Sequence, residues 1–147
     1  MKKYKLGLDI EKIDRIISRD MDANIMQAVG DKVTVSQAYV KDFMINTDKE
    51  DIFQKDLEKQ FDLKRAAIRL MLNNMEKNDL IKRVPVSEDA RLKKIVLTEK
   101  AIALSTKIIG AVDEIEHTLV EDLTQEEIDN FYTVLNKMRN SLSKRKG

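Results

Sequence analysis

Arginine and lysine side chains in the middle of the sequence are its clearest candidates for binding chemistry. Arg65, Arg69 and Asn73 are spaced four residues apart, so one face of a helix would carry two guanidinium groups and an amide. A guanidinium group binds phosphates and carboxylates through paired hydrogen bonds. Residues 64–94 contain nine basic and four acidic residues, whereas the rest of the chain contains 18 and 22. This segregation predicts a polyanionic partner for the middle of the chain, although a solvated charged face would give the same counts.

Two further candidates, Asp89 and Arg91, lie at the tip of a predicted β-hairpin. The segments IKRVPV (81–86) and KKIVL (93–97) are rich in β-forming residues and flank a short polar tip. Asp89 is two residues from Arg91, and we expect an ion pair between them to orient the guanidinium group. Pro85 has no amide hydrogen to donate, so it belongs at a strand edge or where the hairpin leaves the sheet. The hairpin would therefore present an oriented cation at its tip.

Helical periodicity predicts the elements that position these residues. Apolar side chains recur every three or four residues on both sides of the hairpin. Thr34 and Thr124 each precede a glutamine or glutamate by three residues, which is the spacing of a capping box at a helix start. The predicted helices cover residues 8–29, 35–45, 54–61, 65–78 and 99–121, and a last segment that begins at Thr124. We therefore expect a mainly α chain with a small β-hairpin, an α+β fold.

The third and fourth predicted helices have the pattern of a helix-turn-helix. A short connector joins them, and the second helix would bury Ile68, Met71, Leu72 and Met75 on one face. Its opposite, basic face would then suit the major groove of DNA. An ordinary helical hairpin with a charged outer face is the alternative. The hairpin that follows favours a winged helix, to which residues 51–52 would add a short third strand.

The terminal helices carry more apolar surface than one winged helix can cover. A helix of 23 residues, as predicted for 99–121, spans about 35 Å, which exceeds the roughly 30 Å diameter of a small domain. We expect a second copy of the chain to cover the remaining surface. The apolar stripe of the first helix is Ile10, Ile13, Ile17, Met21, Ile25 and Ala28, and that of the last helix is Ile128, Phe131, Leu135, Met138 and Leu142.

Composition limits the classes of protein that fit. The 147 residues and 17.0 kDa suit one domain, and 36 % charged with 5 % aromatic residues favour long amphipathic helices. The absence of cysteine excludes disulfides, zinc ribbons and thiol chemistry. No apolar run approaches the roughly 18 residues that span a bilayer. Asp9 and Glu11 interrupt the basic N-terminus before a signal peptide can develop, so we expect a cytoplasmic protein.

The one histidine, His117, has no catalytic pattern to join. It lies in an acidic stretch of the fifth predicted helix, and the chain has neither a cysteine nor a glycine-rich phosphate loop. We therefore predict no enzyme and no cofactor. A metal site made of His117 and neighbouring carboxylates is an alternative that would make the protein metal-responsive. An exposed helix histidine is the simpler interpretation, so we predict no metal site.

The segments DLEKQFDLKRAAIRLMLNNMEKNDLIKR and DARLKKIVLT resemble the core of the MarR family, the multiple-antibiotic-resistance type of bacterial transcription regulator. The most specific part is the wing pattern, which Asp89, Arg91, Leu97 and Thr98 match. The resemblance extends over nearly the whole chain, because the terminal helices occupy the places of that family's dimerisation helices. It implies that residues 1–147 form one domain, with a winged helix-turn-helix lobe at 33–98 and a helical dimerisation region at 1–32 and 99–147.

The resemblance also implies a function and its residues. The protein would be a homodimer that binds a pseudo-palindromic operator in double-stranded DNA, with helix 65–78 in the major groove and Arg91 in the minor groove. The DNA-binding residues would be Lys64, Arg65, Ala66, Ala67, Arg69, Asn73, Asp89, Arg91, Lys93 and Lys94. A winged-helix protein-interaction module without DNA binding is the alternative.

Three residues depart from the family's pattern. Ala66 and Ala67 stand where Ser and Thr are usual, and Asp79 stands where Gly is usual. Hydroxyl contacts to DNA are thus missing, while alanine methyl groups can still meet thymine methyl groups. The departures leave the operator sequence open.

Three methionines are candidates for an effector site. Met21, Met26 and Met44 would suit an adaptable pocket for a hydrophobic or phenolic molecule, although core packing is the more common role. In the family, such ligands often lie between the dimerisation helices and the winged helix, and they release a repressor from DNA. The sequence leaves open the effector, the target genes, the choice between repression and activation, and which basic residues contact bases.

Overall fold

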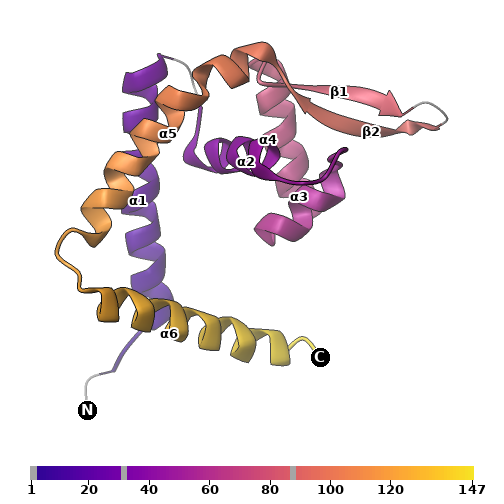
Figure 1. The fold of residues 1–147 in the computed structure, drawn as a ribbon. Coiled ribbons are helices and arrows are strands. Elements are labelled where there is room, and N and C mark those ends of the chain that lie inside the picture. The colour runs from indigo at the N-terminus through magenta and orange to yellow at the C-terminus, as the bar shows by residue number, and fades with distance from the viewer. Residues whose placement is uncertain (1–2, 31–32, 87–88) are drawn as a thin grey trace. The chain divides into compact units, whose positions relative to one another are not determined.

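The computed structural model describes residues 3–30, 33–86 and 89–147, which form six helices and one hairpin (Figure 1). The elements are α1 (Leu6–Val29), α2 (Val35–Asn46), α3 (Gln54–Phe61), α4 (Arg65–Lys77), β1 (Ile81–Val86), β2 (Asp89–Leu97), α5 (Glu99–Val120) and α6 (Gln125–Lys144). The mainly α fold with a small hairpin is confirmed. Residues 87 and 88 of the predicted tip lie outside the described residues. The chain forms two compact units, Met1–Val112 and Asp113–Gly147.

Side-chain caps fix where α2 and α6 begin. The hydroxyl of Thr34 accepts a hydrogen bond from the amide of Gln37 at 3.2 Å, and the Gln37 side chain accepts one from the Thr34 amide at 3.3 Å. Thr124 and Glu127 make the same reciprocal pair at 3.2 and 2.9 Å. Each pair satisfies two of the amides that a helix start leaves free. Both predicted capping boxes are confirmed.

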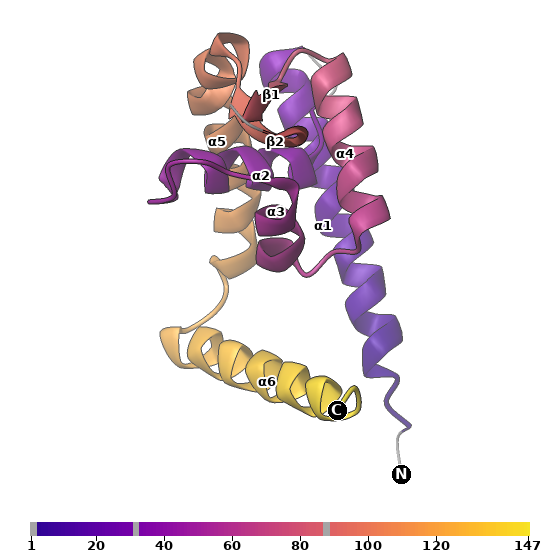
Figure 2. The ribbon, with the colours of Figure 1, turned by 90° about the vertical axis from the view of Figure 1, so that its right-hand side faces the viewer.

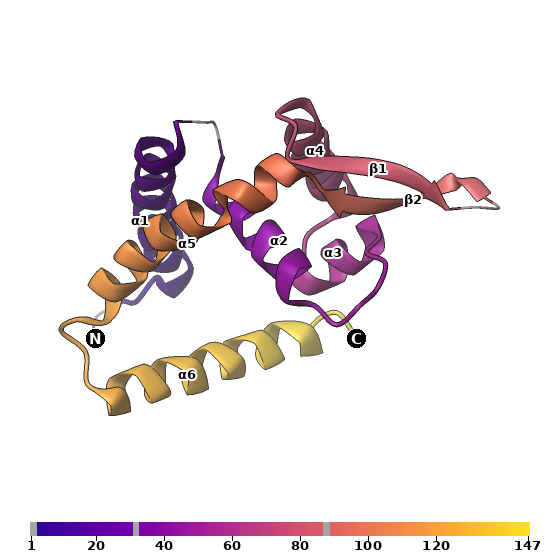
Figure 3. The ribbon, with the colours of Figure 1, turned by 45° about the horizontal axis from the view of Figure 1, so that its top comes forward.

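The helices α2, α3 and α4 and the hairpin form a winged helix within the first unit (Figures 1 and 3). Ile68, Leu72 and Met75 of α4 are buried, and Met71 of the predicted stripe is half-buried. The hairpin projects away from the three helices, and Figure 2 views it along its length. The predicted third strand is a single bridge, in which the amide of Ile95 donates to the carbonyl of Ile52 at 2.7 Å.

The two strands pair antiparallel from Ile81 opposite Leu97 to Pro85 opposite Lys93. The register then shifts between Pro85 and Val86. Pro85 therefore lies where regular pairing ends, which fits the expectation that a residue without an amide hydrogen belongs near the end of the ladder. Arg83 pairs with Ile95 and lies two residues from the buried Ile81. The side chains of all three residues therefore lie on one face of the hairpin.

Asp79 has φ of +59°, the left-handed conformation that glycine adopts most easily. The residue links α4 to β1, and its carbonyl accepts a hydrogen bond from the Thr98 hydroxyl at 2.7 Å. Replacing Asp79 with Gly is expected to raise the free energy of unfolding by about 0.5–1 kcal/mol, because the Cβ strain disappears. Urea denaturation measures this change. Asn78→Gly is the control, since φ of Asn78 is −89° and glycine should destabilise there. A loss of stability in Asp79→Gly would contradict the prediction.

The terminal helices leave large apolar side chains uncovered within one chain. In α6 no residue is buried, and 59 % of Phe131 is exposed. Asn24 of α1 donates to the carbonyl of Ala111 in α5 at 3.3 Å. The large exposed apolar side chains of α1 are Leu6, Leu8, Ile10, Ile13, Ile16 and Met26, and those of α6 are Phe131, Tyr132, Val134 and Leu142. Within the described ranges, no helix combines the length and apolarity needed to cross a membrane.

Candidate nucleic-acid interface

The turn between α3 and α4 sets the direction of the basic helix. Asp62 ends α3 in the left-handed conformation with φ of +48°, and the amide of Leu63 donates back to the carbonyl of Glu58 at 3.1 Å. Lys64 is then extended, so α4 begins at Arg65. Burial of Ile68 and Leu72 turns the opposite face of α4 to solvent. The predicted contact residues of this helix are all exposed: Arg65, Ala66, Ala67, Arg69 and Asn73.

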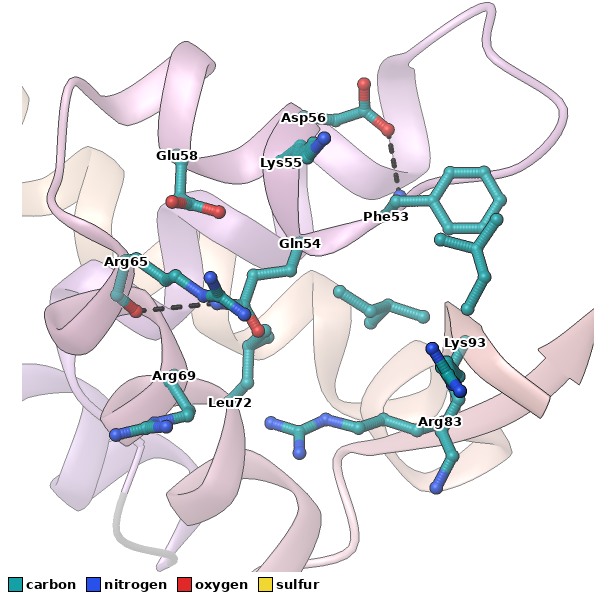
Figure 4. Close-up of a pocket in the computed structure, with 13 residues that line it drawn as sticks. Phe53, Gln54, Lys55, Asp56, Glu58, Arg65, Arg69, Leu72, Arg83 and Lys93 are labelled. Atoms are coloured by element: carbon teal, nitrogen blue, oxygen red, sulfur yellow. Dashed lines mark hydrogen bonds between the residues drawn. The ribbon is translucent and has the colours of Figure 1, made fainter. Parts of the chain in front are cut away.

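A basic groove separates α3 and α4 from the hairpin (Figure 4). It is an open pocket of about 640 Å³. Six of its lining residues are cationic: Lys55, Arg65, Arg69, Arg83, Arg91 and Lys93. Asp56 and Glu58 of α3 are the acids that line it. We call this feature the α4–wing groove, and its excess of cations suits a polyanion.

Among the cations of this groove, the sequence-based site set lacks the exposed Lys55 and the half-buried Arg83. Figure 4 shows the side chain of Arg83 extending from β1 toward α4, where Arg69 and Leu72 lie. One terminal guanidinium nitrogen of Arg83 is buried and has no hydrogen-bond partner among the described residues. A guanidinium group carries five donors, and leaving one unmatched in a buried place costs free energy. In a strand, side chains two residues apart share a face, so the apolar Ile81 could have indicated from the sequence that Arg83 points toward the helices.

The contact between Asp89 and Arg91 differs from the predicted ion pair. The Asp89 carboxylate accepts a hydrogen bond from the backbone amide of Arg91 at 2.9 Å. None of the ion pairs between described residues includes either side chain. The physical reason is that the short aspartate side chain can accept a hydrogen bond from the backbone amide two residues ahead in the sequence. Asp89 therefore holds the backbone at the start of β2, where Arg91 lies, and Arg91 is left exposed.

Neighbouring lysines of β2 have different surroundings. Lys93 is exposed and lines the α4–wing groove. Lys94 is half-buried on a second groove beside Met44, and its ammonium group pairs with Asp51 at 3.4 Å. The alternation of strand side chains explains the difference. The structure therefore does not bring Lys94 together with the other predicted contact residues, and Lys64 is exposed at the start of α4.

Asp56 ties the first turn of α3 to the loop before it. Its carboxylate accepts hydrogen bonds from the Lys49 ammonium group and from the Phe53 amide, the latter at 2.8 Å. The hydrogen bond from Lys49, followed by that from the Phe53 amide, lowers the pKa of Asp56 below its usual 3.8. A lowered carboxyl pKa stabilises the fold above the usual pKa, and this stabilisation is lost as pH falls through the folded-state pKa.

Asp56→Asn is therefore expected to lower the free energy of unfolding by about 1 kcal/mol at neutral pH. The difference from the parent protein should shrink as the pH falls from 3.8 through the lower folded-state pKa of Asp56, because the carboxyl group then becomes uncharged like the amide that replaces it. Urea denaturation at a series of pH values measures it. Asp48→Asn, at an exposed position nearby, should change little. An Asp56→Asn difference that stays constant down to acid pH would contradict the assignment.

The predicted effector and metal residues lie in separate places. Met21 is buried, and its sulfur accepts a hydrogen bond from the Tyr39 hydroxyl at 3.6 Å, whereas Met26 is exposed. Met44 lines the groove that contains Lys94, and that groove includes neither of the other two methionines. His117 is exposed on α5. Across residues 3–30, 33–86 and 89–147, no three potential metal ligands form a group.

Comparison with solved structures identifies the same fold in DNA-binding regulators. MepR of S. aureus, in complex with DNA, matches with a TM-score of 0.84 and 25 % identity over 95 % of this chain and 99 % of MepR. The transcription regulator MarR from Oenococcus oeni PSU-1 matches with a TM-score of 0.72 and 25 % identity, over 92 % of this chain and 99 % of MarR. The organohalide-sensing regulator RdhR-CbdbA1625, bound to 2,4-dichlorophenol, matches with a TM-score of 0.82 and 17 % identity. The match covers 92 % of this chain and 78 % of RdhR-CbdbA1625. No protein-family model matches the chain.

Proposed function

We propose that this chain, a winged-helix transcriptional regulator of the MarR type by its similarity to solved structures, binds DNA as a homodimeric, sequence-specific repressor that a small molecule releases. The observation that carries the DNA-binding part is the α4–wing groove, with six cations along its walls. Arg83 supports it further, because it lines the groove and a guanidinium group carries several donors that could meet a DNA phosphate.

The two walls of the groove would contact DNA differently. Helix α4 would enter the major groove with Arg65, Arg69 and Asn73, while Ala66 and Ala67 meet thymine methyl groups. The hairpin would follow the backbone, with Arg91 in the minor groove. Arginine favours a narrow minor groove because its negative potential is strongest there. Lys64 and Lys93 would contact phosphates, which position the protein without reading sequence.

The dimer would place two such lobes on one duplex. Exposed apolar side chains on α1 and α6 support it, because a second copy of the chain offers the same surfaces in return. A two-fold dimer reads a pseudo-palindrome whose half-site centres lie about one helical turn apart, roughly 34 Å. A protection footprint confined to one asymmetric half-site would argue against it.

The proposed effector is a small hydrophobic or phenolic molecule. RdhR-CbdbA1625, which shares the fold, binds 2,4-dichlorophenol. Met21, Met26 and Met44 remain the predicted contacts, and Met44 lines a groove together with Ile102 of α5. A metal-responsive regulator has less support, since the described residues contain no ligand group.

Variants of α4 test the sequence-specific part of the proposal. The parent protein would first select its site from a pool of random duplexes. Arg65→Ala or Arg69→Ala is then expected to weaken binding to the selected duplex by about 1–3 kcal/mol if each reads a base. Binding to random duplex should fall less, because phosphate contacts persist. Fluorescence anisotropy measures both affinities at one salt concentration.

Lys94→Ala is the matched control for these arginine variants. It also removes one cation, but that cation pairs with Asp51 away from the α4–wing groove. Its affinity for selected duplex should stay within about twofold of the parent, in line with the small effect of an exposed ion pair. A loss in Lys94→Ala as large as that in Arg69→Ala would mean that overall charge, rather than α4, determines binding. Failure of the parent to select any duplex would favour the protein-interaction alternative.

A further inference from the structure

A leucine lies at the centre of the exposed face of α4. Leu70 is 64 % exposed, more than any other large apolar side chain of helices α1 to α5. It is two positions from both Ile68 and Leu72, the buried residues that pack α4 against the core. A helix turns by about 100° per residue, so Leu70 lies about 160° around the axis from each of them. The side chain of Leu70 therefore projects away from the core.

The arginines of α4 lie to one side of this leucine. Arg65 and Arg69 line the α4–wing groove (Figure 4), whereas Leu70 does not line it. Ala66 precedes Leu70 by one helical turn and Asn73 follows it by three residues, and both are exposed. The strip of α4 that lies farthest from the core is therefore uncharged at Ala66, Leu70 and Asn73, and the two arginines flank it.

Exposure alone does not assign a role to Leu70, because single exposed apolar side chains are common on protein surfaces. Its distinction is its place on a helix face whose other features suit a polyanion. If this face only held phosphates, a lysine or a glutamine at position 70 would donate hydrogen bonds to them and would stay hydrated without them. A leucine side chain has neither a donor nor an acceptor. Leu70 can therefore contribute only an apolar contact.

The 5-methyl group of thymine is the apolar group that unmodified base pairs present in the major groove. A helix that enters this groove brings the strip farthest from its own core nearest to the base edges. Cytosine in the same place would present an amino group, which would lose its water and find no acceptor on a leucine. A leucine at this position therefore favours thymine over cytosine.

We infer that Leu70 is a specificity-determining residue, which reads the 5-methyl group of one thymine in each half-site of the operator. The inference rests on the proposed function, because it requires α4 to enter the major groove. It goes beyond the contacts expected of Ala66 and Ala67. A leucine side chain reaches two bonds farther than that of alanine, so it can cover a methyl group that an alanine at this position would leave in water.

Uracil is thymine without the methyl group, so an exchange of thymine for uracil tests the contact and leaves every base-edge hydrogen bond in place. The parent protein first selects its duplex, and the thymines of that site are then exchanged one position at a time, in both half-sites together. Fluorescence anisotropy at one salt concentration measures affinity. At one position, the exchange should weaken binding by about 10- to 20-fold, because each lost methyl contact corresponds to a factor of about four.

Variants then assign this methyl effect to Leu70. Leu70→Ala places a strong helix former on the same exposed face, so the fold should persist. In this variant the effect of the exchange should shrink to about twofold or less, as expected for two groups that interact directly. Ile102→Ala is the matched control, because it also removes an apolar side chain, 56 % exposed, but from α5. It should keep the full effect.

Three results would overturn the inference. The first is a parent protein whose affinity no exchange of thymine for uracil lowers, and the second is a methyl effect of equal size in the parent and in Leu70→Ala. The third is a monomeric Leu70→Ala in sedimentation equilibrium, since Leu70 would then belong to a subunit interface. A selected duplex whose methyl groups have no effect overturns this inference alone, whereas a parent that selects no duplex overturns the proposed function and this inference with it.

Discussion

Replacing Arg91 with alanine is expected to weaken binding to the selected duplex by about 1–3 kcal/mol per subunit, a factor of roughly 5 to 150. Arg91 is exposed on β2, lines the α4–wing groove and has its backbone amide held by the Asp89 carboxylate. A guanidinium group on a backbone held in this way is well placed for the minor groove, where the potential is most negative over A·T-rich sequence. Fluorescence anisotropy at matched salt measures the loss.

Variants of Asp89 separate the observed backbone contact from an ion pair. Asp89→Asn keeps an oxygen that can accept from the Arg91 amide, so it should bind DNA nearly as the parent does. Asp89→Ala removes the acceptor and should weaken binding, though less than Arg91→Ala. The Asp89→Ala, Arg91→Ala double variant should lose little beyond Arg91→Ala alone. Parent-like affinity in Arg91→Ala would show that the hairpin is not a DNA-contacting wing.

Replacing Phe131 with aspartate is expected to produce monomers and to lower DNA affinity by roughly 100- to 10,000-fold. Phe131 is exposed within one chain, and its ring lies edge-on to that of Tyr132 with centroids 5.6 Å apart. A charge there would have to be buried without a partner in a dimer that uses this surface. The DNA loss follows because two linked lobes bind one duplex far more tightly than one lobe does.

Sedimentation equilibrium at micromolar concentration measures the assembly state directly. The parent protein should sediment at about twice 17.0 kDa, and Phe131→Asp at the mass of one chain. Asn130→Asp introduces the same charge at an adjacent exposed position and should remain dimeric. A parent protein that is folded and monomeric at this concentration would refute the dimer and, with it, the expectation of a pseudo-palindromic site.

Local signals predicted most of the fold. The sequence analysis placed helix ends within a few residues, because caps such as Thr34 and Thr124 satisfy amides through side chains only three residues away. The stripe of Ile68, Leu72 and Met75 likewise follows from helical spacing alone. These features depend on neighbours in sequence, so one sequence is enough to find them.

Features that depend on packing between distant segments were missed. Lys41 is buried beside Val40 in α2, but only α4 and α5 together make its position apolar. Arg83 was counted among the basic residues, but its position facing α4 depends on how the hairpin meets that helix. The difference between Lys93 and Lys94 depends on which groove each strand face lines. Charge and spacing alone therefore could not separate DNA contacts from residues with other roles.

The salt dependence of affinity for selected and random duplexes tests the central claim most directly. If α4 and the wing bind DNA as proposed, the logarithm of the association constant should fall linearly with the logarithm of salt concentration, by about 0.9 per phosphate contact. The selected duplex should bind roughly 10³-fold or more tightly than random duplex at physiological salt. Equal affinity for both duplexes, or an affinity that ignores salt, would contradict sequence-specific recognition through the α4–wing groove.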